Sequence, residues 1–562
     1  DMSASVKAYF ALKMIGDAPE TEHMRQAREA IRARGGAAGS NVFTRALLAL
    51  YGIVSWRAVP IMPVEIMLLP RWFPFHLDKV SYWARTVLVP LLVLGALKPR
   101  PVNPRGVTIA ELFTAPPETV RKWPTGAHQA WAGVKVFGAV DWLLKRAEPH
   151  FPAPLRRRAI DAAAAFVTER LNGQNGLGAI YPAMANAVLM FDALGYPPDH
   201  PHLVAARQSI ERLLVVREDE AYCQPCLSPV WDTALAAHAL METGGDAGAA
   251  PVRAALDWLK PLQVLDVKGD WAARRPDVRP GGWAFQYANP HYPDLDDTAV
   301  VAMAMDRADR GGLTPAPKAH AQAIARAREW IEGLQSRDGA WAAFDADNTY
   351  HYLNHIPFAD HGALLDPPSA DVTARCVSLL AQLGETRAAL ARGIDALLKD
   401  QEKDGSWFGR WGMNYIYGTW SALCALAVVG QDSRSEPMRR AVAWLVRVQN
   451  ADGGWGESGD SYKLSCEGFE PSPSTASQTA WAVLGLMAAG EADHPAVARG
   501  VAYLASTQGE DGLWNEPFHT ATGFPRVFYL RYHGYSKFFP LWALARFRNL
   551  KRGNSRAAMF GM

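Results

Sequence analysis

Three carboxyl groups lie within four consecutive residues, Asp294-Leu-Asp296-Asp297. Carboxyl groups this close together cannot all ionise, because their negative charges would repel one another. We therefore expect the cluster to keep a proton at neutral pH. Hydrogen bonds and cations that stabilise the carboxylate left after proton transfer would make that proton more acidic. The cluster is therefore a candidate for a general acid that can protonate a very weak base.

A structural role could account for part of this cluster. Asp297 stands immediately before Thr298, as Asp232 stands before Thr233, and Asp is a common N-cap of helices. We therefore predict that Asp297 caps a helix. A cap explains one carboxyl group and not three, so Asp294 and Asp296 favour chemistry over scaffold.

The elements that position these residues repeat along the chain. A helical segment ends in Gln, and a turn with Gly-x-Trp follows, so that Gln and Trp are six residues apart. The turn usually contains Asp-Gly, a typical helix stop. The four clear copies are Gln335…Trp341, Gln401…Trp407, Gln449…Trp455 and Gln508…Trp514. Two degenerate copies are Gln174…Ile180, and Gln263…Trp271 with a longer spacer.

Between these turns lies a second repeated element, in which Thr and a small residue open an apolar helix. Its copies begin at Asp232, Asp297, Asp371, Gly418 and Gln478. Two helices in each unit indicate stacked helical hairpins, which can close into an α/α barrel. We predict an all-α protein with an N-terminal helical domain over residues 1–226 and an α/α barrel over residues 227–562.

Composition excludes several classes of protein. The 562 residues are enough for two cores, and 49% hydrophobic against 20% charged residues is typical of a globular protein. A net charge of +2 gives no reason to expect nucleic acid as a partner.

Cys223-Gln-Pro-Cys226 has redox or half-zinc spacing but no second pair, so two ordinary thiols are the simpler interpretation. We expect no cofactor and no metal. The longest apolar run, residues 87–97, is too short to span a bilayer.

The Gln…Gly-x-Trp repeats resemble the QW motifs of squalene–hopene and oxidosqualene cyclases. Residues 294–299 are similar to the Asp-x-Asp-Asp-Thr-Ala motif of the squalene–hopene branch. The resemblance covers essentially the whole chain, and further matching segments are residues 228–233, 281–286, 409–415 and 522–525.

This resemblance implies two α/α barrels that enclose a large apolar cavity. It implies an isomerase that protonates squalene and cyclises it to hopene or hopanol. Such enzymes are monotopic proteins at the cytoplasmic face of the cell membrane, and a homodimer is an open possibility. It also implies that an N-terminal stretch with another QW unit is missing, so that the first domain is incomplete. Within the chain, residues 155–160 are basic and could lie on an anionic membrane surface or form a solvated helix face.

The resemblance assigns Asp296 as the proton donor, supported by Asp294 and Asp297. Well-known members have a His four residues after the position of Asp371, hydrogen-bonded to the donor. Here that residue is Arg375. Arg cannot relay a proton, but it could stabilise ionised Asp296. Alternatively, Arg375 pairs with Asp371 at i,i+4 on a helix, and both interpretations stay open.

A cyclising substrate carries a positive charge that nucleophiles would quench. Aromatic faces attract a cation without reacting with it, each by about 0.5–2 kcal/mol. Positions that match the family's motifs supply candidate lining residues, although any one of them is also an ordinary packing residue. They are Trp83, Trp231, Phe285, Phe344, Trp411, Tyr417, Phe524, Phe528, Tyr529, Tyr532 and Tyr535. The Trp residues of the QW turns are expected to tie one hairpin to the next.

Other classes fit less of the sequence. Oxidosqualene cyclases usually show Asp-Cys-Thr-Ala at the acid site, and class II diterpene cyclases lack this density of QW units. A sugar hydrolase on an α/α barrel would need paired carboxylates in a polar groove, and a prenyltransferase β-subunit would need a zinc site. A non-catalytic helical-repeat binding protein would need no acid cluster in an apolar cavity.

Overall fold

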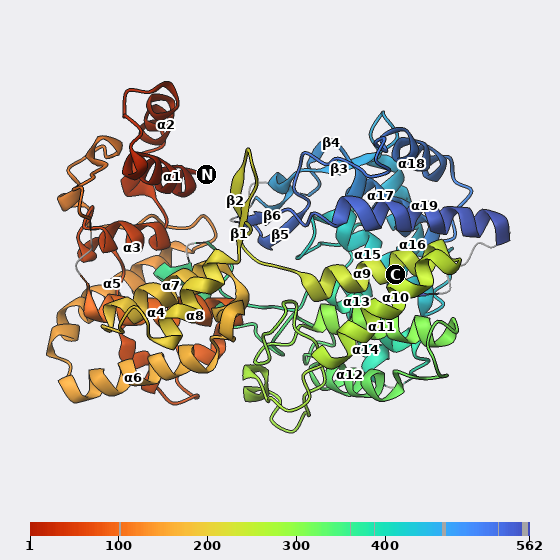
Figure 1. The fold of residues 1–562 in the computed structure, drawn as a ribbon, viewed down its shortest axis with the longest axis horizontal. Coiled ribbons are helices and arrows are strands. Elements are labelled where there is room, and N and C mark those ends of the chain that lie inside the picture. Colours follow the sequence, from red (N-terminus) through yellow and green to blue (C-terminus); the bar gives the residue numbers. More distant parts are fainter. Residues whose placement is uncertain (100–102, 360, 387, 464–467, 527, 554–559) are drawn as a thin grey trace. The chain divides into compact units, whose positions relative to one another are not determined.

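The computed structural model describes residues 1–99, 103–359, 361–386, 388–463, 468–526, 528–553 and 560–562 (Figure 1). The chain divides into two compact units. Unit 1 consists of Asp1–Cys223 and Tyr350–Leu365, and unit 2 of Gln224–Thr349 and Asp366–Met562. Helices dominate both units, as the repeats predict.

Unit 1 is built around the apolar helix α4. The helices of this unit are α1 (Met2–Ile15), α2 (Glu22–Ala33), α3 (Val42–Leu50), α4 (Tyr82–Leu97), α5 (Trp131–Ala147), α6 (Ala153–Glu169), α7 (Tyr181–Ala193) and α8 (Pro201–Glu211). Ser81 caps α4 by accepting a hydrogen bond from the amide of Ala84. The helix packs against α6 and α7, and α7 packs against α8.

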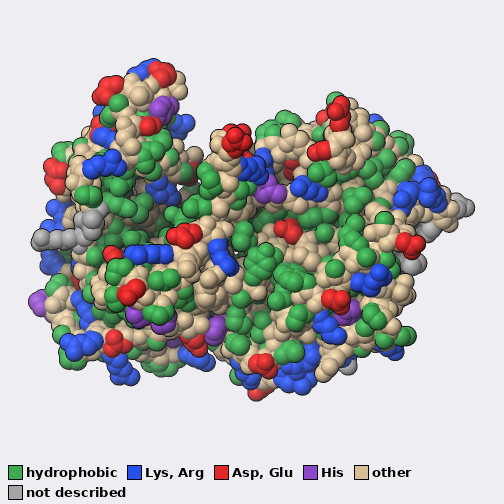
Figure 2. Space-filling model, viewed as in Figure 1, with side chains coloured by type: hydrophobic (Ala, Val, Ile, Leu, Met, Phe, Trp, Pro, Cys, Tyr) green, Lys and Arg blue, Asp and Glu red, His purple; other side chains and the backbone are tan. Residues whose placement is uncertain are grey.

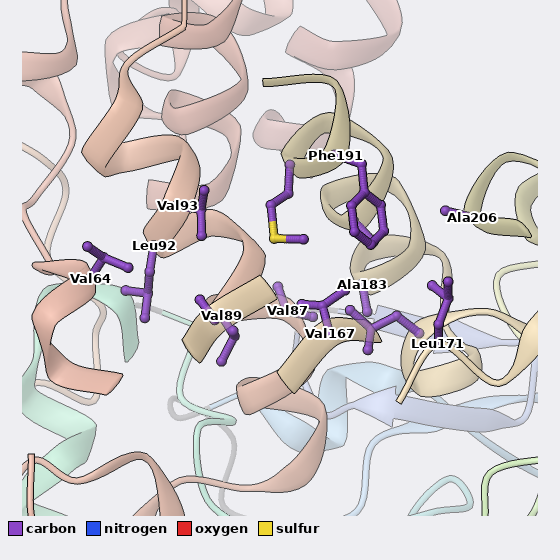
Figure 3. Close-up of a cluster of buried hydrophobic side chains, with 14 of the residues drawn as sticks. Val64, Val87, Val89, Leu92, Val93, Val167, Leu171, Ala183, Phe191 and Ala206 are labelled. Carbon is purple, nitrogen blue, oxygen red and sulfur yellow. The ribbon is translucent and has the colours of Figure 1, made fainter. Parts of the chain in front are cut away.

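The core of unit 1 explains the longest apolar run of the sequence. Val87, Val89 and Leu92 of α4 lie in one buried cluster with Val167 of α6 and Phe191 of α7 (Figure 3). The run is therefore a core helix. Of the helices in the described ranges, none is both long and apolar enough to cross a membrane.

Unit 2 is a closed ring of helices. The inner helices are α9 (Pro229–Thr243), α11 (Leu295–Arg310), α13 (Ala370–Gln382), α15 (Tyr415–Val428), α17 (Ala476–Ala488) and α19 (Tyr535–Gly553). Each inner helix packs against the next, and α19 packs against α9, which closes the ring. The outer helices are α10 (Asp246–Leu259), α12 (Ala321–Gly333), α14 (Ala388–Lys399), α16 (Glu436–Arg447) and α18 (Pro495–Ser506). Outer helices cover the inner ones, as in an α/α barrel (Figure 1), and every residue of α17 is buried.

The strands among the described residues are short and form three antiparallel pairs. These pairs are β1 (Leu214–Val216) with β2 (Ala221–Cys223), β3 (Trp455–Glu457) with β4 (Pro471–Thr475), and β5 (Ala521–Phe524) with β6 (Phe528–Leu530). Cys223 lies at the end of the first hairpin, and Cys226 is a buried thiol that forms no disulfide.

The QW repeat ties three helices together. The indole Nε1 of Trp455 donates to the carbonyl of Leu445 in α16 at 2.8 Å, and its backbone N–H donates to Thr479 Oγ1 in α17 at 2.9 Å. The side-chain amide of Gln449 donates to Ala496 O in α18 at 2.9 Å. The repeated Thr of the inner helices is thus the partner of the QW Trp. The same Trp-to-Thr bond recurs in Trp341–Thr373 and Trp407–Thr419.

One repeat differs from its predicted form. Gln263 donates to Gly281 O at 2.7 Å and to Ala323 O at 2.9 Å. The backbone N–H of Trp283 donates to Thr298 Oγ1 at 2.9 Å, as in the other copies. The predicted partner of Gln263, Trp271, is therefore wrong, and Trp283 takes this place. An inserted loop separates the two halves of the motif and hides the usual six-residue spacing.

The segment Tyr350–Leu365 belongs to unit 1, although the predicted boundary at residue 226 placed it in the second domain. It lies between two parts of unit 2, and Trp83 of α4 donates from its indole to Ala363 O at 2.9 Å. A boundary drawn from the start of the repeats cannot detect a long excursion between two of them.

We predict that Trp455→Ala lowers the free energy of unfolding by about 3–5 kcal/mol, the usual cost of deleting a large buried aromatic side chain. Its indole is fully buried, and the variant loses the bond to Leu445 as well as packing against Gly500. Urea unfolding followed by circular dichroism measures the change. Trp72→Ala, at a Trp that is 78% exposed, is the matched control and should change stability by less than about 0.5 kcal/mol. Equal losses in both variants would contradict the structural role of the QW turn.

Candidate active site

Asp294 is the N-cap of α11. Its Oδ1 accepts hydrogen bonds from the backbone N–H groups of Asp296 at 2.6 Å and Asp297 at 3.1 Å. The prediction that Asp297 caps this helix is therefore wrong. Asp297 lies inside the first turn. The prediction relied on Thr298 as a mark of the helix start, whereas this residue marks the contact with Trp283.

Burial governs the protonation of the cluster. Asp296 is 6% exposed, and burial raises its pKa to about 7; Arg375 lowers this pKa and Asp371 raises it. Burial and the neighbouring carboxyl groups raise the pKa values of Asp294 and Asp297 well above the ordinary value. These raised pKa values favour retention of protons by the cluster at neutral pH, and burial contributes more to each of them than the predicted crowding of the carboxyl groups.

Arg375 faces the proposed acid. Its Nε lies 3.6 Å from Asp296 Oδ1, and its NH2 group donates to the hydroxyl of Tyr417 at 3.2 Å. The guanidinium also lies 4.4 Å from the ring centre of Trp420. The side chain is fully buried, so a fixed cation stands beside Asp296 and can stabilise its carboxylate in a medium that screens charge poorly.

Asp371 has a different role. Its Oδ1 accepts from Ser369 Oγ at 2.6 Å, and its Oδ2 accepts from the backbone N–H groups of Arg410 at 2.9 Å and Trp411 at 2.8 Å. The ion pairs of the described residues include Arg375 with Asp296 and none between Arg375 and Asp371. Asp371 thus fixes the backbone at Trp411, and the geometry favours the interpretation in which Arg375 acts on the acid.

Asp366 does for Phe344 what Asp371 does for Trp411. Its Oδ2 accepts from the backbone N–H groups of Phe344 at 2.8 Å and Asp345 at 3.0 Å. Burial, followed by the charge of Asp345, raises the pKa of Asp366 to about 7. Sequence reasoning missed Asp366, although it lies only five residues before Asp371.

Part of the predicted aromatic lining forms one connected series of rings. The Trp231 indole donates to Tyr535 OH at 2.8 Å. The rings of Tyr535 and Tyr532 lie 5.0 Å apart, and those of Tyr532 and Phe285 lie 5.9 Å apart. Trp481 extends the series from Tyr535, at 5.8 Å, to Tyr417, at 4.9 Å. This series of rings ends at the residue that Arg375 contacts.

A second group of predicted residues lies around Trp411. Its ring is 6.2 Å from that of Phe344, and its carbonyl accepts from the backbone N–H of Thr522 in β5 at 3.2 Å. That strand carries Phe524, which lies 6.2 Å from Phe528 of β6. Tyr529, also in β6, donates from its hydroxyl to Gly459 O at 3.0 Å.

One of the predicted lining residues does not lie with the others in unit 2, and the sequence analysis did not identify two aromatic residues that do. Trp83 belongs to unit 1, and the residues brought together in unit 2 do not include it. Trp420 and Trp481, whose rings lie 6.1 Å apart, were not predicted. Trp420 directly follows the repeated Thr419, where the other copies have Ala, and this exchange was the available signal; Trp481 lies two residues after Thr479, where the residue type varies between copies.

The site combines a buried proton-retaining carboxyl cluster, a fixed cation and aromatic rings inside an α/α ring. These features define a cyclase that starts its reaction by protonating an apolar substrate. Residues 1–219 match the squalene-hopene cyclase N-terminal domain, and residues 227–549 match the squalene-hopene cyclase C-terminal domain. The chain belongs to the squalene–hopene cyclase family and is an isomerase-type enzyme.

Curated relatives agree with this assignment over nearly the full chain. A probable squalene–hopene cyclase of Sinorhizobium fredii is 64% identical over 99% of this chain and 86% of its own length. The squalene–hopene cyclase of Bradyrhizobium diazoefficiens is 62% identical over 100% of this chain and 85% of its own length. That of Zymomonas mobilis is 59% identical over 100% of this chain and 86% of its own length.

We predict that Arg375→Leu moves the alkaline limb of the pH profile of cyclisation to higher pH. Arg375 lowers the pKa of Asp296, so its loss raises that pKa, typically by about 1–3 units for a charge at this distance. The acid then stays protonated to higher pH. The maximal rate should fall, because the carboxylate formed by proton transfer loses its cation. The dependence of kcat/KM on pH measures the limb, and the maximal kcat measures the rate.

Arg375→Lys keeps the charge and serves as the control, with a limb close to that of the parent chain. If the limb of Arg375→Leu stays where it is in the parent, Arg375 does not act on Asp296.

Proposed function

We propose that this chain cyclises squalene to a hopene-type product, with Asp296 as the proton donor. The observation that carries the proposal is the pairing of a buried Asp296, whose pKa is raised to about 7, with Arg375 Nε at 3.6 Å. An acid with a pKa of about 7 is still largely able to donate a proton at neutral pH, and a fixed cation beside it suits the protonation of an unactivated double bond.

The reaction is an isomerisation in which one proton enters and one leaves. The carboxyl group of Asp296 gives its proton to one carbon of a terminal double bond, and the adjacent carbon becomes a cation. Successive double bonds attack this cation, which forms rings and moves the charge along the chain. Loss of a proton from the last cation gives a hopene. Alternatively, water adds to this cation and the added water loses a proton, which gives a hopanol and makes the overall reaction a hydration.

Each neighbour of the acid has a part in this step. Arg375 stabilises the carboxylate that remains on Asp296. The series of rings from Tyr417 to Phe285 offers faces that attract the moving cation without bonding to it. Asp371 and Asp366 hold the backbone of Trp411 and Phe344 in place. The motif matches and this geometry together support these roles.

We predict that Asp296→Asn abolishes conversion of squalene while the fold is retained. An amide cannot supply the proton, and Asn differs little from Asp in size. Purified protein is incubated with squalene in detergent, and the products are analysed by mass spectrometry, with circular dichroism as the test of folding. The control Asp395→Asn, at an exposed carboxylate of α14, should retain full activity. Activity in Asp296→Asn would refute its role as donor, and unchanged squalene with the folded parent chain would favour a binding protein.

We further propose that unit 1 binds to the membrane surface through α5. Trp131, Trp142 and Leu143 of this helix are 73%, 52% and 58% exposed. Lys135 Nζ lies 4.6 Å from the ring centre of Trp131, and the guanidinium of Arg146 lies 4.0 Å from that of Trp142. Exposed aromatic side chains beside basic ones are typical of a helix at a bilayer interface. Figure 2 shows hydrophobic and basic side chains side by side on the surface of unit 1.

The basic segment at residues 155–160 supports this proposal less well. It opens α6, and Arg156 pairs with Glu65 at 3.0 Å and with Glu148 at 3.3 Å. Part of the charge of this segment is therefore neutralised by ion pairs inside unit 1.

A cavity of 1340 Å³ lies between α4 and α5, and Leu88, Leu91 and Trp142 are among its lining residues. Charged side chains, among them Lys135, Arg146 and Glu148, also line this cavity, so apolar and charged groups both face it beside the proposed membrane contact.

We predict that the double variant Trp131→Ser, Leu143→Ser binds to vesicles at least about tenfold more weakly than the parent chain. Two exposed apolar side chains contribute about 1.5–3 kcal/mol each when they leave water. Co-sedimentation with vesicles that contain phosphatidylglycerol measures the binding. Leu513→Ser, at an exposed apolar residue of unit 2, is the control. Equal binding of the double variant and the parent chain would exclude α5 as the membrane contact.

A further inference from the structure

The last three residues of the sequence lie against the inner helices of unit 2. The ring centre of Phe560 is 4.7 Å from the guanidinium of Arg307 in α11. Gly561 lies so close to α13 that an added Cβ would come within 2.7 Å of Ser378 Cβ. Met562 is 1% exposed. This segment, which we call the tail, is therefore packed inside unit 2 and does not extend into solvent.

The tail contacts the faces of α11 and α13 that carry the acid site. Arg375 and Ser378 are three residues apart on α13, and Asp296 and Arg307 are eleven residues apart on α11. Both spacings place two side chains on one face of a helix. Arg375 contacts α11 on one side and Tyr417 of α15 on the other. These faces therefore border the space enclosed by the ring, which we call the lumen.

The spacing also gives the depth that the tail reaches. With a rise of about 1.5 Å per residue, Ser378 lies roughly 4.5 Å along the helix from Arg375, and Arg307 lies roughly 16 Å from Asp296. The tail thus runs from the C-terminal ends of the inner helices to about one turn from Arg375.

Buried charged residues lie at the end of the lumen where the inner helices reach their C-terminal ends. Glu242 of α9 pairs with Arg307 of α11 at 2.6 Å and with Arg546 of α19 at 3.3 Å. All three side chains are largely buried. Charged groups at the mouth of a lumen attract water, and Phe560 covers one of them with an apolar ring.

We propose that Phe560, Gly561 and Met562 close the lumen below Arg375 and keep water away from the ion pair between Arg375 and Asp296. In this role they are positioning residues, because they act through Arg375 and Asp296 and do not touch the substrate. Water in the lumen would screen the ion pair and reduce the burial that keeps Asp296 protonated. The kinetic part of this proposal rests on the proposed function, but the closure of the lumen does not.

Cys424 provides a direct measure of closure. It is a buried free thiol of α15, and burial raises its pKa to about 11, with Arg546 and Arg375 as the charges that act on it next. It therefore lies near both arginines. Cys226 is also buried and free, it lies outside the inner helices, and it serves as the internal control for unfolding.

The experiment deletes residues 560–562 from the full chain and measures modification of each thiol by methyl methanethiosulfonate, with peptide mapping by mass spectrometry. Modification of Cys424 should become at least about tenfold faster, and Cys226 should stay protected. Gly561→Leu keeps the length of the chain and should have the same effect, because its side chain would clash with Ser378. Leu513→Ala is the control and should leave both thiols unchanged.

The pH profile gives a readout that general loosening would not move. Burial raises the pKa of Asp296 more than Arg375 lowers it, so the loss of burial outweighs the screening of Arg375. Hydration therefore lowers this pKa, and the alkaline limb of kcat/KM should shift to lower pH in both tail variants. If the deletion exposes Cys226 as well, Gly561→Leu decides the question. Protection of Cys424 in a folded Gly561→Leu, with the limb of the parent chain, would overturn the proposal. Faster Cys424 modification in a chain that never converts squalene would instead retain closure and refute the proposed function.

Discussion

The constraint on which unit 2 depends is the cost of a carboxylate charge in a medium that cannot solvate it. Burial raises the pKa of Asp296 to about 7, so much of this carboxyl group stays protonated at neutral pH, and in the proposed mechanism Arg375, 3.6 Å away, stabilises the carboxylate left after proton transfer. Both conditions require that water stay out and that the two side chains do not move apart. A closed ring of helices meets these requirements, since each wall of the site is held by a neighbouring helix. The QW hydrogen bonds then fix the spacing between those helices.

Much of this architecture could be predicted from local repetition. The regular distance between Gln and Trp indicates helical hairpins, and the repeated Thr marks each inner helix, so the barrel follows from the period alone. The predictions failed where a repeat is interrupted or where one residue type serves two purposes. An inserted loop separates Gln263 from Trp283, and Tyr350–Leu365 leaves the repeats to join unit 1. Asp297 seemed a cap because it precedes Thr298, yet that Thr binds Trp283 and the cap is Asp294.

In the candidate site too, residues within a motif could be predicted from the sequence, whereas residues that act through tertiary contacts could not. The acid residues and most of the aromatic residues of the site could be predicted from matching motifs. The structure places all of these predicted residues except Trp83 in one unit. The supporting residues are harder to predict, because their signal is a contact between distant segments. Asp366 and Asp371 act by accepting backbone N–H groups of loops far along the chain. Trp420 and Trp481 complete a stack that only the ring geometry creates. Whether Arg375 pairs with Asp371 or faces Asp296 depended on a distance that no pattern of residues contains.

The seam between α9 and α19 has a consequence for how the protein is made. These two helices are neighbours in the ring although about 300 residues separate them in the chain. Contacts this distant in sequence form slowly, and during synthesis they must wait until the later helix has left the ribosome. The growing chain therefore carries an open crescent in which the carboxyl groups are hydrated, have low pKa values and are ionised at neutral pH. The reactive acid comes into being as a property of the finished chain, when the last inner helix docks.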